Sequence, residues 1–276
     1  MHIHWFPGHM TKSLREMEDS LPLADIVLYV LDARAPQSCI NPIFGEKVGH
    51  KPIIYILNKA DLVLEAEVDK WVGKLSAQNT AAVKLNATAS GGGKIIFPLI
   101  KKLAAERLER FKNKGLSCGL RGMVIGVPNT GKSTIINNLC GAAKTITGNK
   151  PGVTRGKQWV RVNEYFELLD TPGTLYPKLS DQATARKLAY IGSIKDEVTD
   201  TLGLAYAFIE DVHSLYPDVI KNRYGVEPQI SAAETLQLIA KARGHMQRGG
   251  VPDVERAAIG LLDDFRKGRL GKIILD

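Results

Sequence analysis

Short apolar runs alternate with longer amphipathic segments over the first two thirds of the chain. The continuous apolar runs occupy residues 26–31, 53–57, 82–85 and 123–125. Such runs are typical of strands buried on both faces of a parallel sheet. Helical patterning lies between them, over residues 11–21, 40–49, 65–78 and 97–112. This alternation predicts an α/β fold with a doubly wound sheet, whose ligands bind at the carboxyl ends of the strands.

The pattern changes after residue 180, where apolar positions recur at helical spacing and strand-like runs stop. The predicted helices there span residues 181–196, 199–212, 213–223, 231–247 and 253–267. Polar residues that suit helix starts stand at the first position of three of them, and Thr11 has the same role in the first helix. These three are Asp181, Ser231 and Asp253. We therefore predict two domains, an α/β domain at residues 1–176 and a small all-α C-terminal domain at residues 177–276.

A loop in the middle of the chain has the spacing of a phosphate-binding loop. Residues 126–134 match Gly-x-x-x-x-Gly-Lys-[Ser/Thr], between the run at 123–125 and a helical segment at 135–139. Glycines let backbone N–H groups converge on one anion, which a helix N-terminus also favours. The alternative is a glycine-rich turn that binds nothing. The residues expected to contact a nucleotide are Asn129, Thr130, Gly131, Lys132, Ser133 and Thr134, with Lys132 on the β- and γ-phosphates and Ser133 on Mg2+.

A second motif, Asn58-Lys59-Ala60-Asp61, directly follows the apolar run at 53–57. An aspartate carboxylate can accept hydrogens from N1 and the 2-amino group of guanine, whereas adenine presents an acceptor at N1 and lacks the amino group. We therefore predict that Asp61 selects GTP and GDP. Asn58 is expected to tie this loop to the phosphate loop, and the Lys59 stem to pack on the base. The backbone N–H groups expected to face the guanine O6 belong to Asn86 and Ala87.

Two polar segments after the phosphate loop predict contacts with Mg2+ and the γ-phosphate. Thr154 lies in a polar, glycine-bearing loop at residues 150–156 and is the candidate to ligate Mg2+; an ordinary loop threonine is the alternative. Paired strands are expected at 159–162 and 165–169, and the second runs into Asp170-Thr171-Pro172-Gly173. Asp170 would hold Mg2+ through water, and the Gly173 N–H would contact the γ-phosphate.

The order of these motifs is unusual. In ordinary GTPases the phosphate loop comes first and Asn-Lys-x-Asp comes late, whereas here residues 58–61 precede residues 126–134. A circular permutation of one P-loop GTPase sheet explains this order, because compact domains tolerate new termini at exposed loops. As a consequence, the segment at 170–173 leads directly into the predicted helical domain, so contacts with the γ-phosphate could reorient that domain.

The net charge of +8 is confined to the middle of the chain. Residues 99–176 contain 13 Lys and Arg against five Asp and Glu, whereas the segments on either side are balanced. A basic patch beside a nucleotide site predicts a polyanionic partner, with RNA the leading candidate. The alternative is a solvated helix face over residues 99–114, where Glu106 and Glu109 interleave with the cations. Basic residues crowd the last third of the chain too, with the same two interpretations.

Other features narrow the class of protein. The apolar runs are too short to span a bilayer, and residues 1–10 lack the pattern of a signal or transit peptide. Three scattered cysteines without metal-ligand spacing favour reduced thiols. A metal site made by His2, His4 and His9 finds no Cys or carboxylate at short range to support it. We expect a cytoplasmic protein with no membrane partner.

Taken together, these motifs resemble the YlqF/RbgA family of circularly permuted GTPases over essentially the whole chain. The segments that carry the resemblance are 5–10 (Trp-Phe-Pro-Gly-His-Met), 31–34 (Leu-Asp-Ala-Arg), 58–61, 126–134, 151–154 (Pro-Gly-Val-Thr), 170–173, 183–186 (Ala-Thr-Ala-Arg) and 264–268 (Asp-Phe-Arg-Lys-Gly). The resemblance implies a GTPase that assists late maturation of the large (50S) ribosomal subunit, and we expect it to be monomeric. It implies binding to a precursor of that subunit, made of ribosomal RNA and proteins, with the helical domain on the RNA.

The resemblance also implies roles for two residues in hydrolysis. Many GTPases place a water-orienting glutamine after Asp-x-x-Gly, where this chain has Thr174. His9 matches the family's N-terminal histidine and is our candidate to orient water or offset phosphate charge; anchoring the N-terminal segment or contacting RNA is its alternative. Asn129 matches the asparagine that helps to ligate K+ in related potassium-dependent GTPases. A different class, an RNA-binding scaffold whose nucleotide is structural, stays open at this point.

Overall fold

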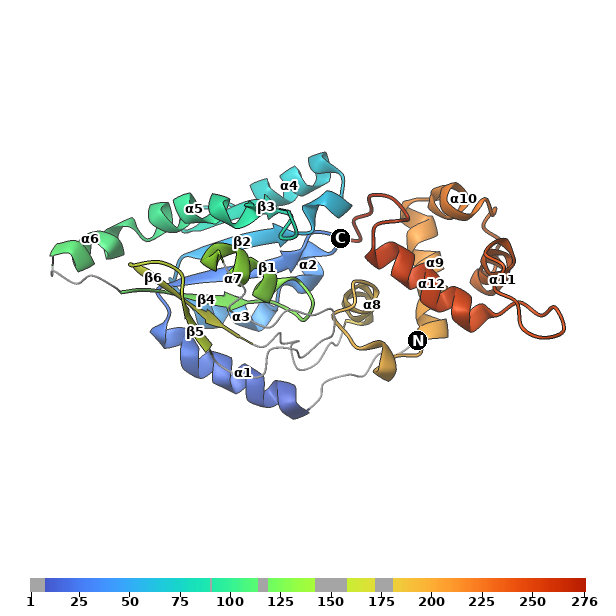
Figure 1. Ribbon diagram of the computed structural model, residues 1–276, viewed down its shortest axis with the longest axis horizontal. Coiled ribbons are helices and arrows are strands. Elements are labelled where there is room, and N and C mark those ends of the chain that lie inside the picture. Colours follow the sequence, from blue (N-terminus) through green and yellow to red (C-terminus); the bar gives the residue numbers. More distant parts are fainter. Residues whose placement is uncertain (1–7, 90, 114–118, 142–157, 172–180) are drawn as a thin grey trace.

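Six strands form one sheet in the described part of the chain (Figure 1). The structure is a computed structural model that describes residues 8–89, 91–113, 119–141, 158–171 and 181–276. Across the sheet the order is β3 (Thr80–Leu85), β2 (Ile53–Asn58), β1 (Ile26–Asp32), β4 (Leu120–Ile125), β6 (Phe166–Asp170) and β5 (Gln158–Arg161). Neighbouring strands are parallel except β5, which runs antiparallel to β6. The predicted α/β sheet is confirmed.

The strand β1 lies near the centre of the sheet, and this position explains why its sequence is continuously apolar. Every residue from Ile26 to Asp32 is buried, because helices cover both faces of the strand. One face carries Val27, Tyr29 and Leu31, and the other carries residues 26, 28 and 30. In register, Asp32 of β1 pairs with Asn58 of β2, so the polar ends of these two strands lie side by side.

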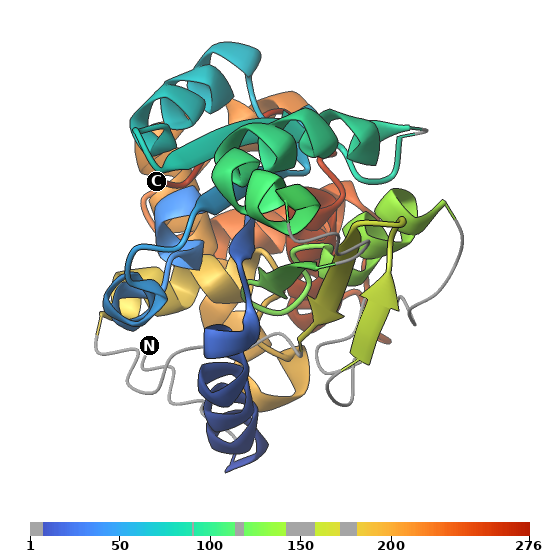
Figure 2. The ribbon, with the colours of Figure 1, turned by 90° about the vertical axis from the view of Figure 1, so that its left-hand side faces the viewer.

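Two layers of helices enclose the sheet (Figure 2). The layer over residues 26, 28 and 30 contains α5 (Ile96–Leu103) and α7 (Lys132–Cys140), which bury Ile96, Ile100, Ile135, Ile136 and Leu139. The opposite apolar cluster includes side chains from α1 (Gly8–Ser20), α2 (Pro36–Cys39), α3 (Pro42–Val48) and α4 (Glu65–Leu75). The carboxyl ends of β1, β2, β3 and β4 all open at one edge of the sheet.

Helices from the last third of the chain pack beside that edge (Figure 1). They are α8 (Gln182–Tyr190), α9 (Thr201–Leu215), α10 (Val219–Tyr224), α11 (Ala232–Ala242) and α12 (Val254–Arg266). One buried apolar cluster runs from the α1 face of the sheet into these helices, reaching Phe208 and Phe265. After α12 the chain returns to the sheet, where the Leu275 N–H donates to the Arg34 carbonyl at 2.7 Å. The helical region and the sheet therefore share a core.

Several predicted helix limits differ from the structure. The first helix already includes Gly8, so Thr11 lies inside it rather than at its N-cap. The segment predicted as one helix over 97–112 is divided into α5 and α6 (Ala105–Asn113) at Ala104. The helix predicted to reach 196 ends at Tyr190, because Gly192 turns the chain with a φ of 79°. Asp181 and Asp253 do cap their helices, whereas the Ser231 side chain makes no capping hydrogen bond.

Candidate nucleotide site

The phosphate loop links β4 to α7 with a tightly turned backbone. Gly126, Asn129 and Gly131 have φ angles of 149°, 61° and 95°. A Cβ on Gly126 would lie 2.3 Å from the Val30 carbonyl oxygen, and one on Gly131 would lie 2.3 Å from the Asn58 Nδ2. Glycine is therefore needed at both positions by conformation and by space. The predicted strand–loop–helix setting is present, with α7 beginning at Lys132.

The side chains of the loop fold inward over its own backbone. The Lys132 Nζ donates to the Val127 carbonyl at 3.0 Å, and the Thr130 hydroxyl donates to the same carbonyl at 3.0 Å. Lys132 is buried, which places its ammonium inside the loop. Ser133 and Thr134 lie in the first turn of α7 and are half-buried. A cation inside a turned loop at a helix N-terminus fits the charge of a phosphate chain.

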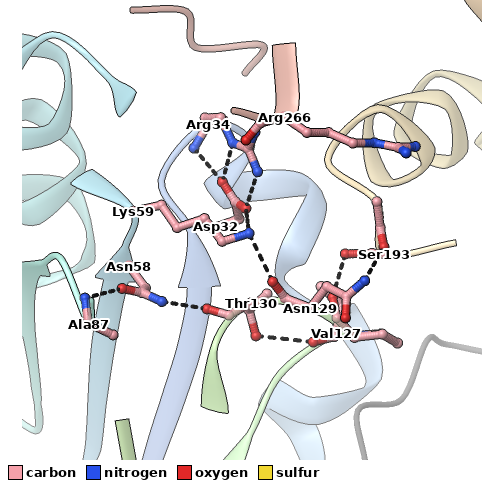
Figure 3. A network of polar contacts seen from close by, with 12 residues as sticks. Asp32, Arg34, Asn58, Lys59, Ala87, Val127, Asn129, Thr130, Ser193 and Arg266 are labelled. Atoms are coloured by element: carbon pink, nitrogen blue, oxygen red, sulfur yellow. Dashed lines mark hydrogen bonds and ion pairs between the residues drawn. The ribbon is translucent and has the colours of Figure 1, made fainter. Parts of the chain in front are cut away.

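Asn58 joins the guanine motif, which is residues 58–61, to the phosphate loop at residues 126–134 (Figure 3). Its Nδ2 donates to the Thr130 carbonyl at 2.7 Å, so the contact that we expected between the two loops is present. Its Oδ1 accepts the Ala87 N–H at 2.9 Å. That N–H, which we expected to face the guanine O6, is therefore engaged by Asn58, and Ala87 instead helps to orient the asparagine. The Asn138 amide holds the same loop by donating to the Ala87 carbonyl at 2.5 Å.

Lys59 makes a second connection between the same two loops. Its backbone has a φ of 60°, in the left-handed region, and its Nζ donates to the Asn129 carbonyl at 2.9 Å. The same Nζ lies 2.8 Å from the Asp32 Oδ2. Ala60 and Asp61 follow in a short 3-10 helix, and the Asp61 side chain is exposed at the same edge of the sheet. Asn86, just beyond β3, accepts the Thr88 N–H at 2.9 Å.

Asp32 lies between two cations, and its electrostatics follow from that position. Arg34 forms a bidentate pair with it, through Nε at 2.8 Å and Nη2 at 2.7 Å. Burial alone would raise the pKa of the Asp32 carboxyl, but Arg34 and Lys59 outweigh burial and hold the pKa well below its ordinary value. The family resemblance includes Asp32 and Arg34 in the segment 31–34, without a role at the site. Charged residues at the end of a buried strand were the signal that could have placed them at the site.

The helical region touches the phosphate loop directly, which sequence reasoning missed. The Asn129 Nδ2 donates to the Gly192 carbonyl at 2.7 Å. The Ser193 hydroxyl donates to the Pro128 carbonyl at 2.7 Å, and Ser193 is 1% exposed. Both partners belong to the turn after α8, which carries no sequence signal for a ligand site. Figure 3 shows the turn beside Asn129 and Val127.

The remaining predicted residues are described in part or not at all. Asp170 ends β6, and the neighbouring Thr171 hydroxyl donates to the Val124 carbonyl at 2.6 Å, which fixes this strand end beside the phosphate loop. Thr154, Gly173 and the side chains of His9 and Asp170 lie outside the described residues. Among the described residues, no cluster of three or more His, Cys, Asp or Glu could hold a metal ion. No helix in the described ranges is long and apolar enough to cross a membrane.

Comparisons with known proteins agree with this site. A family model described as "50S ribosome-binding GTPase" matches residues 121–241, from β4 through the phosphate loop into the helical region. Ribosome biogenesis GTPase A of Bacillus cereus is 37% identical over 278 residues, covering 100% of this chain and 94% of the relative. The protein of the same name from Thermotoga maritima is 34% identical over 98% of this chain and 92% of its own length. Mitochondrial ribosome-associated GTPase 1 of Xenopus tropicalis is 34% identical, covering 99% of this chain and 94% of its own.

Solved structures give the same result. A GDP-bound structure of a YlqF protein has a TM-score of 0.66 at 28% identity, covering 95% of this chain and 98% of its own. GNP-bound YlqF from T. maritima has a TM-score of 0.65 at 29% identity, covering 96% of this chain and 97% of its own. Three findings therefore agree: the phosphate loop, the guanine motif joined to it through Asn58, and relatives that are 34% to 37% identical over nearly the whole chain. The chain belongs to the ribosome biogenesis GTPase A (YlqF/RbgA) family of circularly permuted GTPases.

Proposed function

We propose that this GTPase hydrolyses GTP during late maturation of the large (50S) ribosomal subunit, on a precursor made of ribosomal RNA and proteins. The observation that carries the proposal is the joint at Asn58, which holds the guanine motif on the phosphate loop in a chain of this family. The description of the matching family, a 50S ribosome-binding GTPase, supports the choice of subunit. The proposal includes a monomeric protein that acts in the cytoplasm.

Both motifs and the segments after the phosphate loop contact the nucleotide. Asp61 accepts the guanine N1 and 2-amino hydrogens, the Lys59 stem packs on the base, and backbone at Asn86 approaches O6. Residues 129–134 bind the phosphates, with Lys132 on the β- and γ-phosphates. When bound, Mg2+ neutralises charge on the β- and γ-phosphate oxygens. Its ligands in this chain would be Ser133, Thr154 and, through water, Asp170. The Gly173 N–H contacts the γ-phosphate.

Hydrolysis requires an oriented water and charge neutralisation more than a strong base. We assign one of these two tasks to His9, whose imidazole orients water or, when protonated, offsets the developing charge. His9→Ala should then lower subunit-stimulated turnover at least tenfold while GTP affinity stays constant. Unchanged stimulated turnover would remove His9 from the mechanism. We assign to Asn129 a role in ligating K+, which would supply positive charge near the phosphates. Equal hydrolysis rates in KCl and NaCl would exclude this role.

The division of labour along the chain is also part of the proposal. Residues 1–176 form the GTPase domain, and residues 177–276 provide the surface that contacts ribosomal RNA. Arginines and lysines that crowd the last third of the chain support an RNA-facing surface. The hydrogen bond that Gly192 accepts from Asn129 and the one that Ser193 donates to Pro128 give that surface a direct route to the nucleotide.

The test compares GTP hydrolysis with purified large subunits, small subunits and immature large-subunit particles. Strong stimulation by large-subunit particles and none by small subunits is the expected result, because a partner must complete the site. Tight particle binding that is the same with GTP and GDP, without stimulated hydrolysis, would favour an RNA-binding scaffold instead. Stimulation by small subunits would overturn the choice of subunit.

A further inference from the structure

A fully buried carboxylate lies between the guanine motif and the end of α12. The Asp32 side chain is 1% exposed and receives Arg34 on both of its oxygens. Its Oδ2 also lies 2.8 Å from the Lys59 Nζ. Figure 3 shows the three charged groups in line above the phosphate loop. None of the proposed nucleotide contacts uses Asp32 or Arg34, although both are buried beside the site.

The Lys59 end of this line reaches the phosphate loop. The Nζ contacts both Asp32 and the Asn129 carbonyl, at 2.8 and 2.9 Å. Lys59 also has a left-handed backbone, a conformation that persists in a residue other than glycine only where its surroundings hold it. Two anchors at the ammonium thus fix the direction of the stem, which is the part of the side chain assigned to the base. Loss of one anchor would free the stem.

The Arg34 end of the line reaches the helical region. The Nη1 donates to the carbonyls of Phe265 and Arg266, at 3.4 and 3.1 Å, which are the last two residues of α12. The guanidinium also lies over the Phe265 ring, 5.0 Å from its centroid. A cation at the last carbonyls of a helix satisfies acceptors that the helix itself leaves open and complements the helix dipole. The position of Arg34 therefore depends on where the C-terminal end of α12 lies.

Burial makes Asp32 and Arg34 interdependent, since both side chains are almost completely buried. A buried ion pair that loses one partner leaves an uncompensated charge, which is strongly unfavourable. Arg34 is 1% exposed, so neither it nor Asp32 can turn to water in place of the other. Movement of the α12 end would therefore displace Arg34, then Asp32, and with it the anchor of Lys59.

We propose that Asp32 and Arg34 are positioning residues for the guanine nucleotide, which hold Lys59 on the phosphate loop and make its position depend on how α12 is seated. The proposal rests on the proposed function, since it concerns the same nucleotide site. It adds two residues to that site and a connection to the helical region that is separate from the turn at Gly192 and Ser193.

The first experiment measures GDP affinity by calorimetry with Mg2+, well below the unfolding midpoint of each variant. Asp32→Asn removes the charge and puts an amide where both neighbours are donors, so GDP affinity should fall at least tenfold. The matched control is Asp25→Asn, just before the other end of β1, where Asp25 pairs with Arg107 at 2.6 Å. Its GDP affinity should stay within about twofold of the wild type, and that of Arg34→Lys should fall at least threefold, because lysine keeps the charge but lacks the planar fork.

A purely structural role gives a different result. In that case Asp32→Asn lowers the unfolding midpoint but leaves GDP affinity and the KM for GTP unchanged, which overturns the proposal. According to the proposal, Asp32→Asn should raise the KM for GTP while kcat at saturating GTP stays within about twofold. The reason is that Arg34, Asp32 and Lys59 act on the base and not on the γ-phosphate. If Asp32→Asn fails to fold, Arg34→Lys against Asp25→Asn decides the matter. A wild-type protein that binds no GDP would contradict the proposed function rather than this inference.

A second experiment tests the connection to α12. Arg266 anchors the end of that helix by donating to the carbonyls of Ala189 and Tyr190, at 2.9 and 3.0 Å. Arg266→Ala should weaken GDP binding in the wild type at least threefold but add little in the Arg34→Lys background, since the connection is already broken there. Additive losses, or no loss in the wild type, would overturn the connection.

Discussion

The side-chain amide of Asn58 donates a 2.7 Å hydrogen bond to the Thr130 carbonyl, across 72 residues of sequence. This bond closes the guanine motif onto the phosphate loop although the two motifs stand in reversed order along the chain. The close approach also explains the glycine at 131, because a Cβ there would meet the same amide at 2.3 Å. Permutation changed the connections between the strands and kept this contact between their ends.

Replacing Asn58 with alanine should weaken both folding and nucleotide binding. The change removes the partner of the Thr130 carbonyl and of the Ala87 N–H, in a site where Asn58 is 3% exposed. Each buried polar group left unpaired costs about 1–3 kcal/mol. We expect urea unfolding to show a loss of that order and GDP affinity to fall at least tenfold.

The matched control for this change is Asn79→Ala. The Asn79 amide also donates to a backbone carbonyl, that of His50 at 2.8 Å, but it is exposed. Its loss should cost less than about 0.5 kcal/mol, as is usual for surface substitutions. Equal losses of stability and affinity in the two variants would show that the joint at Asn58 is unimportant.

A methyl group at Gly131 should damage the nucleotide site more than a methyl group at another left-handed glycine. Gly131 and Gly141 flank α7 with φ angles of 95° and 67°, but a Cβ on Gly141 meets nothing within 4 Å. Gly141→Ala should therefore cost only about 1 kcal/mol of backbone strain. Gly131→Ala adds a clash with Asn58 and should lower GDP affinity at least tenfold. Titration of GDP into both variants checks this difference, and similar affinities would contradict it.

The charge state of Asp32 should make the free energy of unfolding decrease at low pH. Its folded-state pKa lies well below the ordinary value near 3.8, because Arg34 and Lys59 outweigh the effect of burial. A depressed pKa stabilises the fold at pH above the unfolded value, and this contribution is lost as pH falls toward the folded one. Between pH 7 and 5 the contribution should be constant. Below about pH 4 it should decline by up to about 1.4 kcal/mol per pH unit.

Urea unfolding of the wild type and Asp32→Asn at pH 7, 5, 4 and 3 isolates this group. Other carboxyls such as Asp264 also have lowered pKa values, so the wild-type curve alone mixes several contributions. The difference between the two proteins should stay level from pH 7 to 5 and shrink below about pH 4. A difference that is independent of pH would contradict the assignment.

Much of the sheet and the main motifs could be predicted because their signals are local. Continuous apolar runs marked the central strands, since burial on both faces leaves no polar alternation, and β1 is the clearest case. The guanine motif and phosphate loop carry fixed spacings whose geometry follows from glycine and a helix N-terminus. The contact from Asn58 to the phosphate loop could be expected because strand ends meet at one edge of a parallel sheet.

Most of the missed features depend on residues that are distant in sequence. Arg34 donates to the carbonyl of Arg266 across 232 residues of sequence, and Ser193 donates to that of Pro128 across 65. The local sequence around an arginine or a serine does not indicate such a distant partner. The Ala87 N–H was assigned to guanine because its competitor, the Asn58 Oδ1, depends on a side-chain rotamer. The division between α5 and α6 at Ala104 has neither proline nor glycine beside it to mark it.

Exchanging the carboxylate of Asp61 for an amide should change which base the protein prefers. A carboxylate offers acceptors to N1–H and the 2-amino group of guanine, whereas an asparagine amide can accept one hydrogen and donate to the 2-oxo group of xanthine. The exposed side chain of Asp61, in a 3-10 helix just beyond β2, contributes little to the stability of the fold, so the exchange should leave the unfolding midpoint nearly unchanged.

We expect Asp61→Asn to lose at least a hundredfold in GDP affinity and to gain in affinity for xanthosine diphosphate. Calorimetric titration of both nucleotides into wild type and variant measures the ratio. A variant that keeps the wild-type preference for GDP would place the base elsewhere, whereas loss of both nucleotides together with a lowered midpoint would show that Asp61 supports the loop rather than selecting guanine.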